Sequence, residues 1–229
     1  MSQPTFLHMT DEEYFSRPEI SNSELGALES ELSMDDQLFG DRKKAYRFGT
    51  LLDTMITSPG NYNYFKNSIG DITYEPEEVS LAKSMCKAFY LDPFCVALLD
   101  ISQTQLVAIR DVEFQTATES FTLPMKCKFD FYVKSINGWA GVIMDHGYDL
   151  KSTVATSQQQ FENVCERFNY DRQTAVYMTI ANIDRMGIIG VSKKNNKIFK
   201  KLIQRGDETF NRGYEKMLTL AYKYHLMFG

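Results

Sequence analysis

The sequence lacks the features of a membrane or secreted protein. No stretch approaches the roughly 18 consecutive apolar residues that a membrane-spanning helix requires. The first residues are polar and acidic, without the basic start and apolar stretch of a secretory signal. We therefore expect a cytoplasmic protein with no membrane partner.

Cysteine and histidine are scarce, and both are scattered. The four cysteines contain no Cys-x-x-Cys pair: Cys86, Cys95, Cys127 and Cys165. This spacing excludes a zinc ribbon, a thioredoxin-type site and a disulfide framework, and it predicts reduced thiols. The three histidines are too scattered to predict a zinc site: His8, His146 and His225.

What is present is an ordinary globular composition with an uneven charge. Hydrophobic residues make up 43% and charged residues 24% of the 229 residues, which excludes long disorder and coiled coil. The net charge is −5, but residues 1–120 hold 9 Lys/Arg against 20 Asp/Glu, and residues 121–229 hold 16 against 10. The basic half either presents a patch that follows a phosphate backbone or has ordinary solvated helix faces.

The first half of the chain has mainly helical patterns. Ser21 and Glu24 form a capping box, which predicts the start of a short helix. A second helix is predicted over residues 46–56 from the spacing of its apolar positions, and Ser58-Pro59-Gly60 ends it. Residues 61–120 are expected to be mainly helical, with helices over residues 77–97 and a weaker helical pattern over residues 103–114.

The second half begins with strands and ends with helices. Alternating apolar and polar residues predict strands from Glu119 to Val133 and over Tyr148–Thr153. Between them, Asn137-Gly138 predicts a hairpin turn before a strand at residues 139–144. Helical patterns follow from Ser157 and over residues 207–227. We expect one domain over residues 1–229 of the α/β (α+β) class. A small central mixed sheet and C-terminal helices follow a mainly helical part that ends at residue 118.

The candidate chemistry lies at Asp130 and at Asp149-Leu150-Lys151. In a strand, Asp149 and Lys151 face one side and Leu150 the other. If Asp130 lies on the adjacent strand, the two carboxylates come together and favour Mg²⁺ or Mn²⁺ between them. A lysine beside such a metal can orient or deprotonate a water for hydrolysis of a phosphodiester. The Asp-x-Lys pair alone also occurs on ordinary surface strands.

A second pattern follows on a predicted helix. Gln173 and Tyr177 are spaced i, i+4 and share one helix face. Placed after a hairpin with Asp…Asp-x-Lys, this pair resembles the RecB-type branch of the PD-(D/E)xK nuclease superfamily. In that branch the Gln approaches the catalytic centre and the Tyr faces the DNA.

The chain is most similar to the RecE-like phage and prophage exonucleases. The similar segments are ISNSEL, FGTLLDTMITSPGNY, KCKFD, YDLKST, NYDRQTAVY and the Arg205-Gly206-x-x-x-Phe210 motif. The resemblance implies a restriction-endonuclease-like core that binds Mg²⁺ or Mn²⁺. It implies metal ligation by Asp130, Asp149 and the main-chain carbonyl of Leu150, and a catalytic role for Lys151 and Gln173. By the same resemblance Ser23 and Tyr177 approach the DNA.

The sequence departs from this family at two positions. Asp53 stands where the family usually has a His, and Phe129 stands where it usually has a Pro before Asp130. A carboxylate is also a Mg²⁺ ligand, so we expect Asp53 to take the place of the His. Asp145 is a rival second ligand, but Asp149 alone has a Lys two residues later. Some RecB-type relatives bind an iron–sulfur cluster through late cysteines, and because none follows Cys165 we expect no cluster here.

Three basic residues around this constellation are candidate phosphate contacts: Lys126, Lys128 and Arg172. The alternative is that the two lysines simply alternate outward on a half-exposed strand.

Together these features predict a Mg²⁺-dependent 5′-to-3′ exodeoxyribonuclease that acts on duplex ends in recombination or repair. The resemblance implies a homo-oligomeric ring around the DNA and a single-strand annealing protein as a partner. One alternative is a catalytically weak or inactive nuclease-fold module that binds DNA or another partner. Another is a small interaction protein with an accidental motif match.

Overall fold

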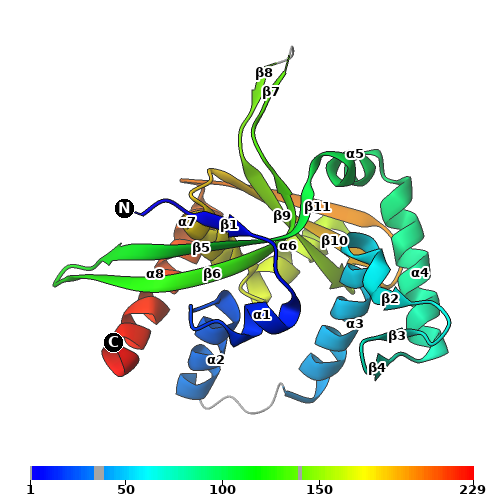
Figure 1. The fold of residues 1–229 in the computed structure, drawn as a ribbon, viewed down its shortest axis with the longest axis horizontal. Helices are drawn as coiled ribbons and strands as arrows, with labels where there is room; N and C mark the ends of the chain where they lie inside the picture. The colour runs from blue at the N-terminus through cyan, green and yellow to red at the C-terminus, as the bar shows by residue number, and fades with distance from the viewer. Residues whose placement is uncertain (1, 34–38, 139–140) are drawn as a thin grey trace.

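The computed structural model describes residues 2–33, 39–138 and 141–229 (Figure 1). The helices are α1 (Asp11–Ser16), α2 (Asn22–Ser33), α3 (Phe39–Thr57), the short 3₁₀ helix η2 (Pro59–Asn61), α4 (Pro76–Leu91), α5 (Pro93–Ile101), α6 (Gln158–Arg167), α7 (Tyr170–Ala181) and α8 (Glu208–Phe228). The strands are β1 (Thr5–Leu7), β2 (Tyr62–Asn63), β3 (Ser68–Ile69), β4 (Ile72–Thr73), β5 (Gln103–Gln115), β6 (Ser120–Val133), β7 (Ile136–Gly138), β8 (Gly141–Ile143), β9 (His146–Thr153), β10 (Arg185–Ser192) and β11 (Ile198–Gln204). No helix of the described residues is long and apolar enough to cross a membrane.

A six-stranded sheet in the order β1-β5-β6-β9-β10-β11 forms the centre of the molecule. Its neighbours are antiparallel except β9 and β10, which run parallel. Parallel neighbours need a long crossover connection, and α6 and α7 supply it. This confirms the predicted α/β class with a central mixed sheet flanked by helices.

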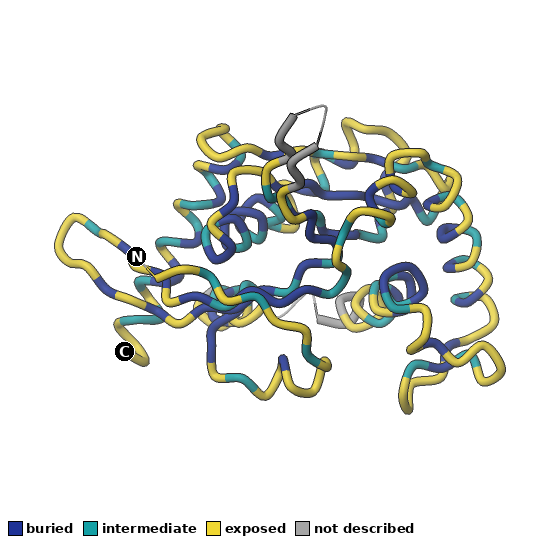
Figure 2. The backbone as a smooth tube through the Cα atoms, turned by 45° about the horizontal axis from the view of Figure 1, so that its top comes forward, coloured by how far each residue is buried: buried dark blue, intermediate teal, exposed yellow. Residues whose placement is uncertain are grey.

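Two hydrophobic cores lie on the two faces of this sheet. Residues of α2, α6, α7 and α8 pack on one face. Residues of α3, α4 and α5 pack on the other, where they meet Leu150 and Phe131 of the sheet. Figure 2 shows that burial follows the central strands and that the far end of the β5–β6 ribbon is exposed. The central strands therefore lie between two layers of helices, and their side chains contribute to the core on each face.

The structure confirms the predicted start of α2 and the presence of the helix that follows it. The Ser21–Glu24 capping box is confirmed, because the Ser21 N–H donates to Glu24 Oε2 at 2.7 Å and the Glu24 N–H donates to Ser21 Oγ at 3.3 Å. The helix predicted over residues 46–56 is also present, but α3 begins earlier, at Phe39. Residues 39–45 thus extend the predicted helix at its N-terminal end, and residues 34–38 before it lie outside the described residues.

Two predictions for the strands were wrong. Residues 103–115 form β5, a 13-residue strand, not a helix. It pairs along most of its length with β6, so the first 118 residues contribute to the central sheet and are not only helical. Asn137 and Gly138 lie within β7 and pair with β8, so they are not the turn of that hairpin. Of the predicted strand at residues 139–144, residues 139–140 lie outside the described residues.

Candidate active site

Asp130 and Asp149 lie where two strands of the central sheet separate. The antiparallel ladder between β6 and β9 ends with Phe131 opposite Tyr148, and the same register would next place Asp130 opposite Asp149. In place of a further ladder bond, Asp130 Oδ2 accepts a hydrogen bond from the Leu150 N–H at 2.6 Å. The two carboxylates therefore lie on adjacent strands, at the point where the ladder between β6 and β9 ends.

Asp149 and Lys151 project together from β9. Asp149 is only 4% exposed, and its Oδ2 lies 2.6 Å from Lys151 Nζ. This contact is a buried ion pair, in which the Lys151 ammonium is the partner of Oδ2. Asp149 Oδ1 accepts a hydrogen bond from Gln173 Nε2 of α7 at 2.6 Å. The side chain of Leu150 is buried in the core on the other face, as strand alternation requires.

Asp53 reaches the same region from α3. Gln105 Nε2 donates hydrogen bonds to Asp53 Oδ2 at 3.1 Å and to Thr57 Oγ1 at 2.9 Å. Thr57 Oγ1 in turn donates to Asp53 Oδ1 at 3.2 Å. Gln105 lies in β5 at the register position opposite Asp130, and its φ of 55° is in the left-handed region that non-glycine residues rarely adopt. A strained backbone position thus holds the amide against the Asp53 carboxylate.

The pKa values of these groups report the crowding of negative charge. Burial, followed by the charges of Asp53 and Asp149, raises the pKa of Asp130 well above its usual value. Burial is also the main cause that raises the pKa of Asp53 to about 6, and the charge of Asp149 adds to it. Burial alone would lower the pKa of Lys151, but the charges of Asp149, Tyr170 and Asp130 raise it instead. Lys151 is therefore an ammonium at neutral pH, among carboxylates that attract a cation.

Aromatic rings of β6 and α7 pack against each other beside the strands that carry the carboxylates. Tyr177 packs edge-on against Phe129 with the ring centroids 5.2 Å apart. Phe129, which replaces the Pro of the resembled family, is fully buried, and a Cβ at Gly147 of β9 would come 2.3 Å from its ring. The missing side chain at Gly147 thus makes room for Phe129. Burial raises the pKa of Tyr177 far above its usual value, so its hydroxyl stays protonated.

Two of the predicted phosphate contacts lie inside the protein. Lys126 is 2% exposed, and its Nζ donates to the carbonyl oxygens of Tyr14 at 3.0 Å and Arg17 at 2.7 Å. Arg172 is 5% exposed and donates to Asn22 Oδ1 and to the Glu29 carboxylate of α2. Both cations hold N-terminal elements against the sheet and α7, so the predicted phosphate contact does not hold for either residue.

The other two candidate contacts outside α7 remain accessible. Lys128 is partly exposed and forms an ion pair with Asp11, which is itself largely exposed. Its charge also acts on the pKa of Asp53, so it lies near the carboxylates. Ser23 is exposed in the first turn of α2. Both stay predictions as DNA contacts.

Asp145, the rival for the second acidic position, has a different role. Its Oδ2 accepts from the Tyr132 hydroxyl at 2.7 Å, and its Oδ1 accepts from the Ser135 N–H at 2.6 Å. These bonds hold the end of β6 to the start of β9. Asp149, not Asp145, is the residue that meets Lys151 and Gln173.

The donor set fits a small divalent cation. Mg²⁺ is usually bound in proteins through one or two carboxylates and keeps several waters. Asp130 and Asp149 supply two carboxylates, and the repulsion that helps to raise the pKa of Asp130 is what a cation between them would relieve. Among the described residues no three His, Cys, Asp or Glu groups converge as a ready metal centre. The fit is therefore to two carboxylates and water, with Asp53 beside them.

Sequence reasoning missed two residues of this site. Gln105 falls in a stretch that was predicted as helix, and its left-handed backbone has no sequence signal because that conformation favours Gly and Asn. Tyr170 starts α7, and its ring lies under the Lys151 ammonium, with Nζ 5.0 Å from the ring centroid. Its spacing of three residues before Gln173 could have indicated a place on the same helix face.

Fold and site together define a mixed α/β protein with an acidic cluster and a lysine at an opening of its central sheet. The sequence matches no protein-family model and no curated protein. The solved structures that match this one include the following two, both at low similarity. One is the protein SSO0001, at 10% identity, over 80% of this chain and 73% of that chain, with a TM-score of 0.39. The other is a phage-related exonuclease from Haemophilus somnus 129PT, at 15% identity and a TM-score of 0.32. That similarity covers 52% of this chain and 61% of the exonuclease.

Proposed function

We propose that this protein is a metal-dependent DNA nuclease. The observation that carries the proposal is the meeting of Asp130, Asp149 and Lys151 at the opening of the sheet. Gln173 of α7 fixes the Asp149 carboxylate from the other side. Two carboxylates and a lysine in this arrangement are suited to hydrolysis of a phosphodiester through a bound divalent cation.

Each residue has a distinct role in this proposal. Asp130, Asp149 and the Leu150 carbonyl hold Mg²⁺ or Mn²⁺, and Asp53 contributes a nearby negative charge or a further ligand. The cation, when bound, lowers the pKa of a water and neutralises charge on the phosphoryl oxygen. Lys151, as an ammonium, stabilises the charge that develops on the phosphate. Gln173 keeps Asp149 oriented, whereas Tyr177 packs against Phe129, so its part in DNA contact rests on the resemblance alone.

The finer features of the proposal rest on the resemblance to RecE-like exonucleases. They are 5′-to-3′ digestion from duplex ends, action in recombination or repair, a homo-oligomeric ring and an annealing protein as a partner. Lys128 and Ser23 are the remaining candidate DNA contacts outside α7. Residues 121–229 carry more basic than acidic residues, and this excess supports an attraction between that part of the chain and the DNA backbone.

The test is digestion of end-labelled linear and closed circular duplex DNA with Mg²⁺, Mn²⁺ or EDTA. We expect metal-dependent loss of linear DNA only, and none with the Lys151→Ala variant. Separate labels on the 5′ and 3′ ends give the polarity. Lys200→Ala is a matched control. Lys200 lies on β11, outside the acidic cluster, and forms an ion pair with Asp92 at 2.7 Å. Full activity of Lys151→Ala would contradict the assignment.

A non-catalytic DNA-binding or interaction module is the second candidate. It is favoured by Asp53 at the position of the family His and by the absence of a converged three-residue metal group among the described residues. A module of this kind binds DNA at every Mg²⁺ and Mn²⁺ concentration but releases no nucleotides. Calorimetric metal binding without cleavage of either DNA would favour it over the nuclease.

A further inference from the structure

A line of aromatic and basic side chains leads from the surface to Lys151. The Lys151 ammonium lies 5.0 Å from the centroid of the Tyr170 ring. That ring stacks on Phe168, with centroids 6.1 Å apart and planes inclined by 27°. The Arg167 guanidinium in turn lies 5.8 Å from the centroid of Phe168. We call Arg167, Phe168 and Tyr170 the aromatic path.

Phe168 is exposed although it is a large apolar residue next to the core. It is 57% exposed, whereas Tyr170 is largely covered by its neighbours. The Phe168 ring is therefore open to solvent, and a flat ligand can lie against it.

The backbone holds Phe168 firmly at the surface. Its N–H donates to the Val164 carbonyl at 3.0 Å, which ends α6. Asn169 follows with a φ of 54°, in the left-handed region that Asn tolerates. The Asn169 side chain accepts from Lys216 Nζ at 2.8 Å and donates to Glu29. The ring of Phe168 is therefore pre-positioned, and little entropy is lost when a ligand stacks on it.

The charges at the two ends of the path select the kind of ligand. Arg167 lies at the outer end and Lys151 at the inner end, and the rings lie between them. A single nucleic-acid strand has the complementary pattern, because its phosphates alternate with flat bases that stack on aromatic side chains whatever their sequence. A purely apolar ligand could stack on Phe168 but would make no use of the Arg167 guanidinium beside it.

We propose that the aromatic path stacks a nucleobase of the DNA strand whose phosphate lies at Lys151. The inference rests on the proposed nuclease function and adds the position and the residues that bind a base beside the site. Phe168 supplies the stacking face, Arg167 binds a flanking phosphate, and Tyr170 links the base to the Lys151 side chain. Stacking of this kind holds the strand without selecting its sequence.

The test uses single-stranded oligonucleotides that carry one 2-aminopurine at successive positions from the end. The protein carries Asp149→Asn so that the DNA stays intact. We expect one 2-aminopurine position to change its fluorescence on binding, because stacking on a ring quenches it. Phe168→Ala and Phe168→Leu should remove that change and weaken binding about tenfold, whereas Phe168→Tyr, which keeps a ring, should retain both.

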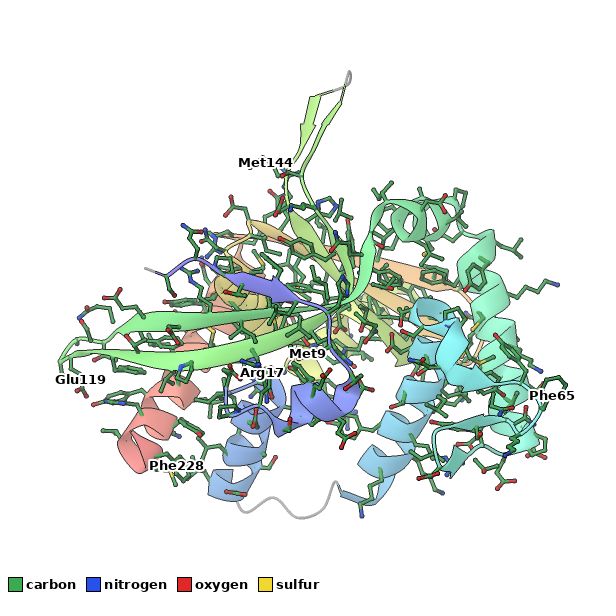
Figure 3. All side chains as sticks on the ribbon, in the orientation of Figure 1. Met9, Arg17, Phe65, Glu119, Met144 and Phe228 are labelled. Atoms are coloured by element: carbon green, nitrogen blue, oxygen red, sulfur yellow. The ribbon has the colours of Figure 1, made fainter. Side chains whose placement is uncertain are left out.

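Phe65→Ala is the matched control, because Phe65 is a fully exposed phenylalanine on the β2–β3 connection, at the edge of the molecule in Figure 3. It should bind DNA as the parent does. Unchanged binding and fluorescence in Phe168→Ala and Phe168→Leu would overturn the aromatic path. The nuclease proposal would survive that result if the protein with native Asp149 still cleaves DNA. Failure of the parent to bind or cleave any DNA would overturn both.

Discussion

The Asp130 carboxylate takes the place of a strand partner for the Leu150 amide. Its Oδ2 accepts the Leu150 N–H at 2.6 Å, one position beyond the last ladder pair of β6 and β9. The backbone of one acidic strand thereby fixes the carboxylate of the other. Because both partners belong to the central sheet, the acidic cluster is built on rigid elements, which keeps catalytic groups in register.

Crowded carboxylates should cost stability when no cation is bound. We expect Asp53→Asn to raise the free energy of unfolding in EDTA at pH 7.5 by about 1–2 kcal/mol, because it removes a buried charge beside Asp130 and Asp149. Urea denaturation measures this change. Calorimetry with Mn²⁺ should show weaker metal binding by the same variant.

Asp100→Asn is the control for this prediction. Asp100 is an exposed carboxylate on α5, and its replacement should change the free energy of unfolding by less than about 0.5 kcal/mol. Destabilisation of Asp53→Asn in EDTA would contradict the idea that the carboxylates repel one another.

Gln105 should act on the metal through Asp53. Gln105→Gly relieves the left-handed backbone, which is worth about 1 kcal/mol, but removes the hydrogen bonds to Asp53 and Thr57. We expect a folded protein whose stability is within about 1 kcal/mol of the parent and whose Mn²⁺ affinity is lower by about 10–100-fold. Combined with Asp53→Asn, the substitution should cause little further loss of affinity. Additive losses would show that Gln105 does not act through Asp53.

Replacing Lys126 and replacing Lys128 should have different effects, although the two residues lie only two positions apart on β6. We expect Lys128→Ala to lower the salt slope of DNA binding by about 1, because a partly exposed cation is lost. Lys126→Ala should leave that slope unchanged. It should instead destabilise the fold by about 1–3 kcal/mol, because two carbonyl oxygens lose their donor. Binding titrations at several salt concentrations measure the slopes. A lower salt slope for Lys126→Ala, with an unchanged slope for Lys128→Ala, would show that Lys126 and not Lys128 contacts the DNA.

The acidic cluster could be predicted from sequence because strand alternation determines it. Asp149 and Lys151 share a face in any strand, and that rule needs no tertiary information. The burial of Lys126 could not be predicted in the same way. Its partners are the carbonyl oxygens of Tyr14 in α1 and of Arg17 just after α1, which lie more than 100 residues earlier in the chain. The strand at residues 103–115 was missed because residues 106–109 form a continuous apolar run, which fits a helix as well as a strand, although the residues after it alternate between buried and exposed.

Replacement by alanine should lower the stability of the protein at Gly147 and raise it at Gly49. At Gly147 a Cβ would lie 2.3 Å from the Phe129 ring, so we expect Gly147→Ala to destabilise the protein by about 1–3 kcal/mol through overpacking. At Gly49, inside α3, a Cβ would meet nothing within 4 Å. Gly49→Ala should stabilise the helix by up to about 1 kcal/mol. Urea denaturation of both variants measures the difference, and equal effects would contradict the fit between Gly147 and Phe129.

Asp171 should make the stability of the protein depend on pH. Its buried carboxylate accepts hydrogen bonds from Arg212 Nε at 2.8 Å, Lys216 Nζ at 2.9 Å and the Arg172 N–H at 2.8 Å. Burial alone would raise the pKa of Asp171, but these donors lower it below its ordinary value of 3.8. The unfolded chain therefore binds the proton more readily than the native protein, and stability is lost as the pH falls from about 4 through the native pKa.

Asp171→Asn should remove this dependence. At pH 7 we expect the variant to be less stable by about 2 kcal/mol, because two cations of α8 lose their partner. The difference from the parent should shrink in urea denaturation below about pH 4, where the unfolded parent is protonated. Asp184→Asn is the control, since the Asp184 carboxylate is 70% exposed in its ion pair with Arg205 and should contribute less than about 1 kcal/mol at any pH. A difference for Asp171→Asn that stays constant down to pH 3 would mean that packing, not charge, determines its effect.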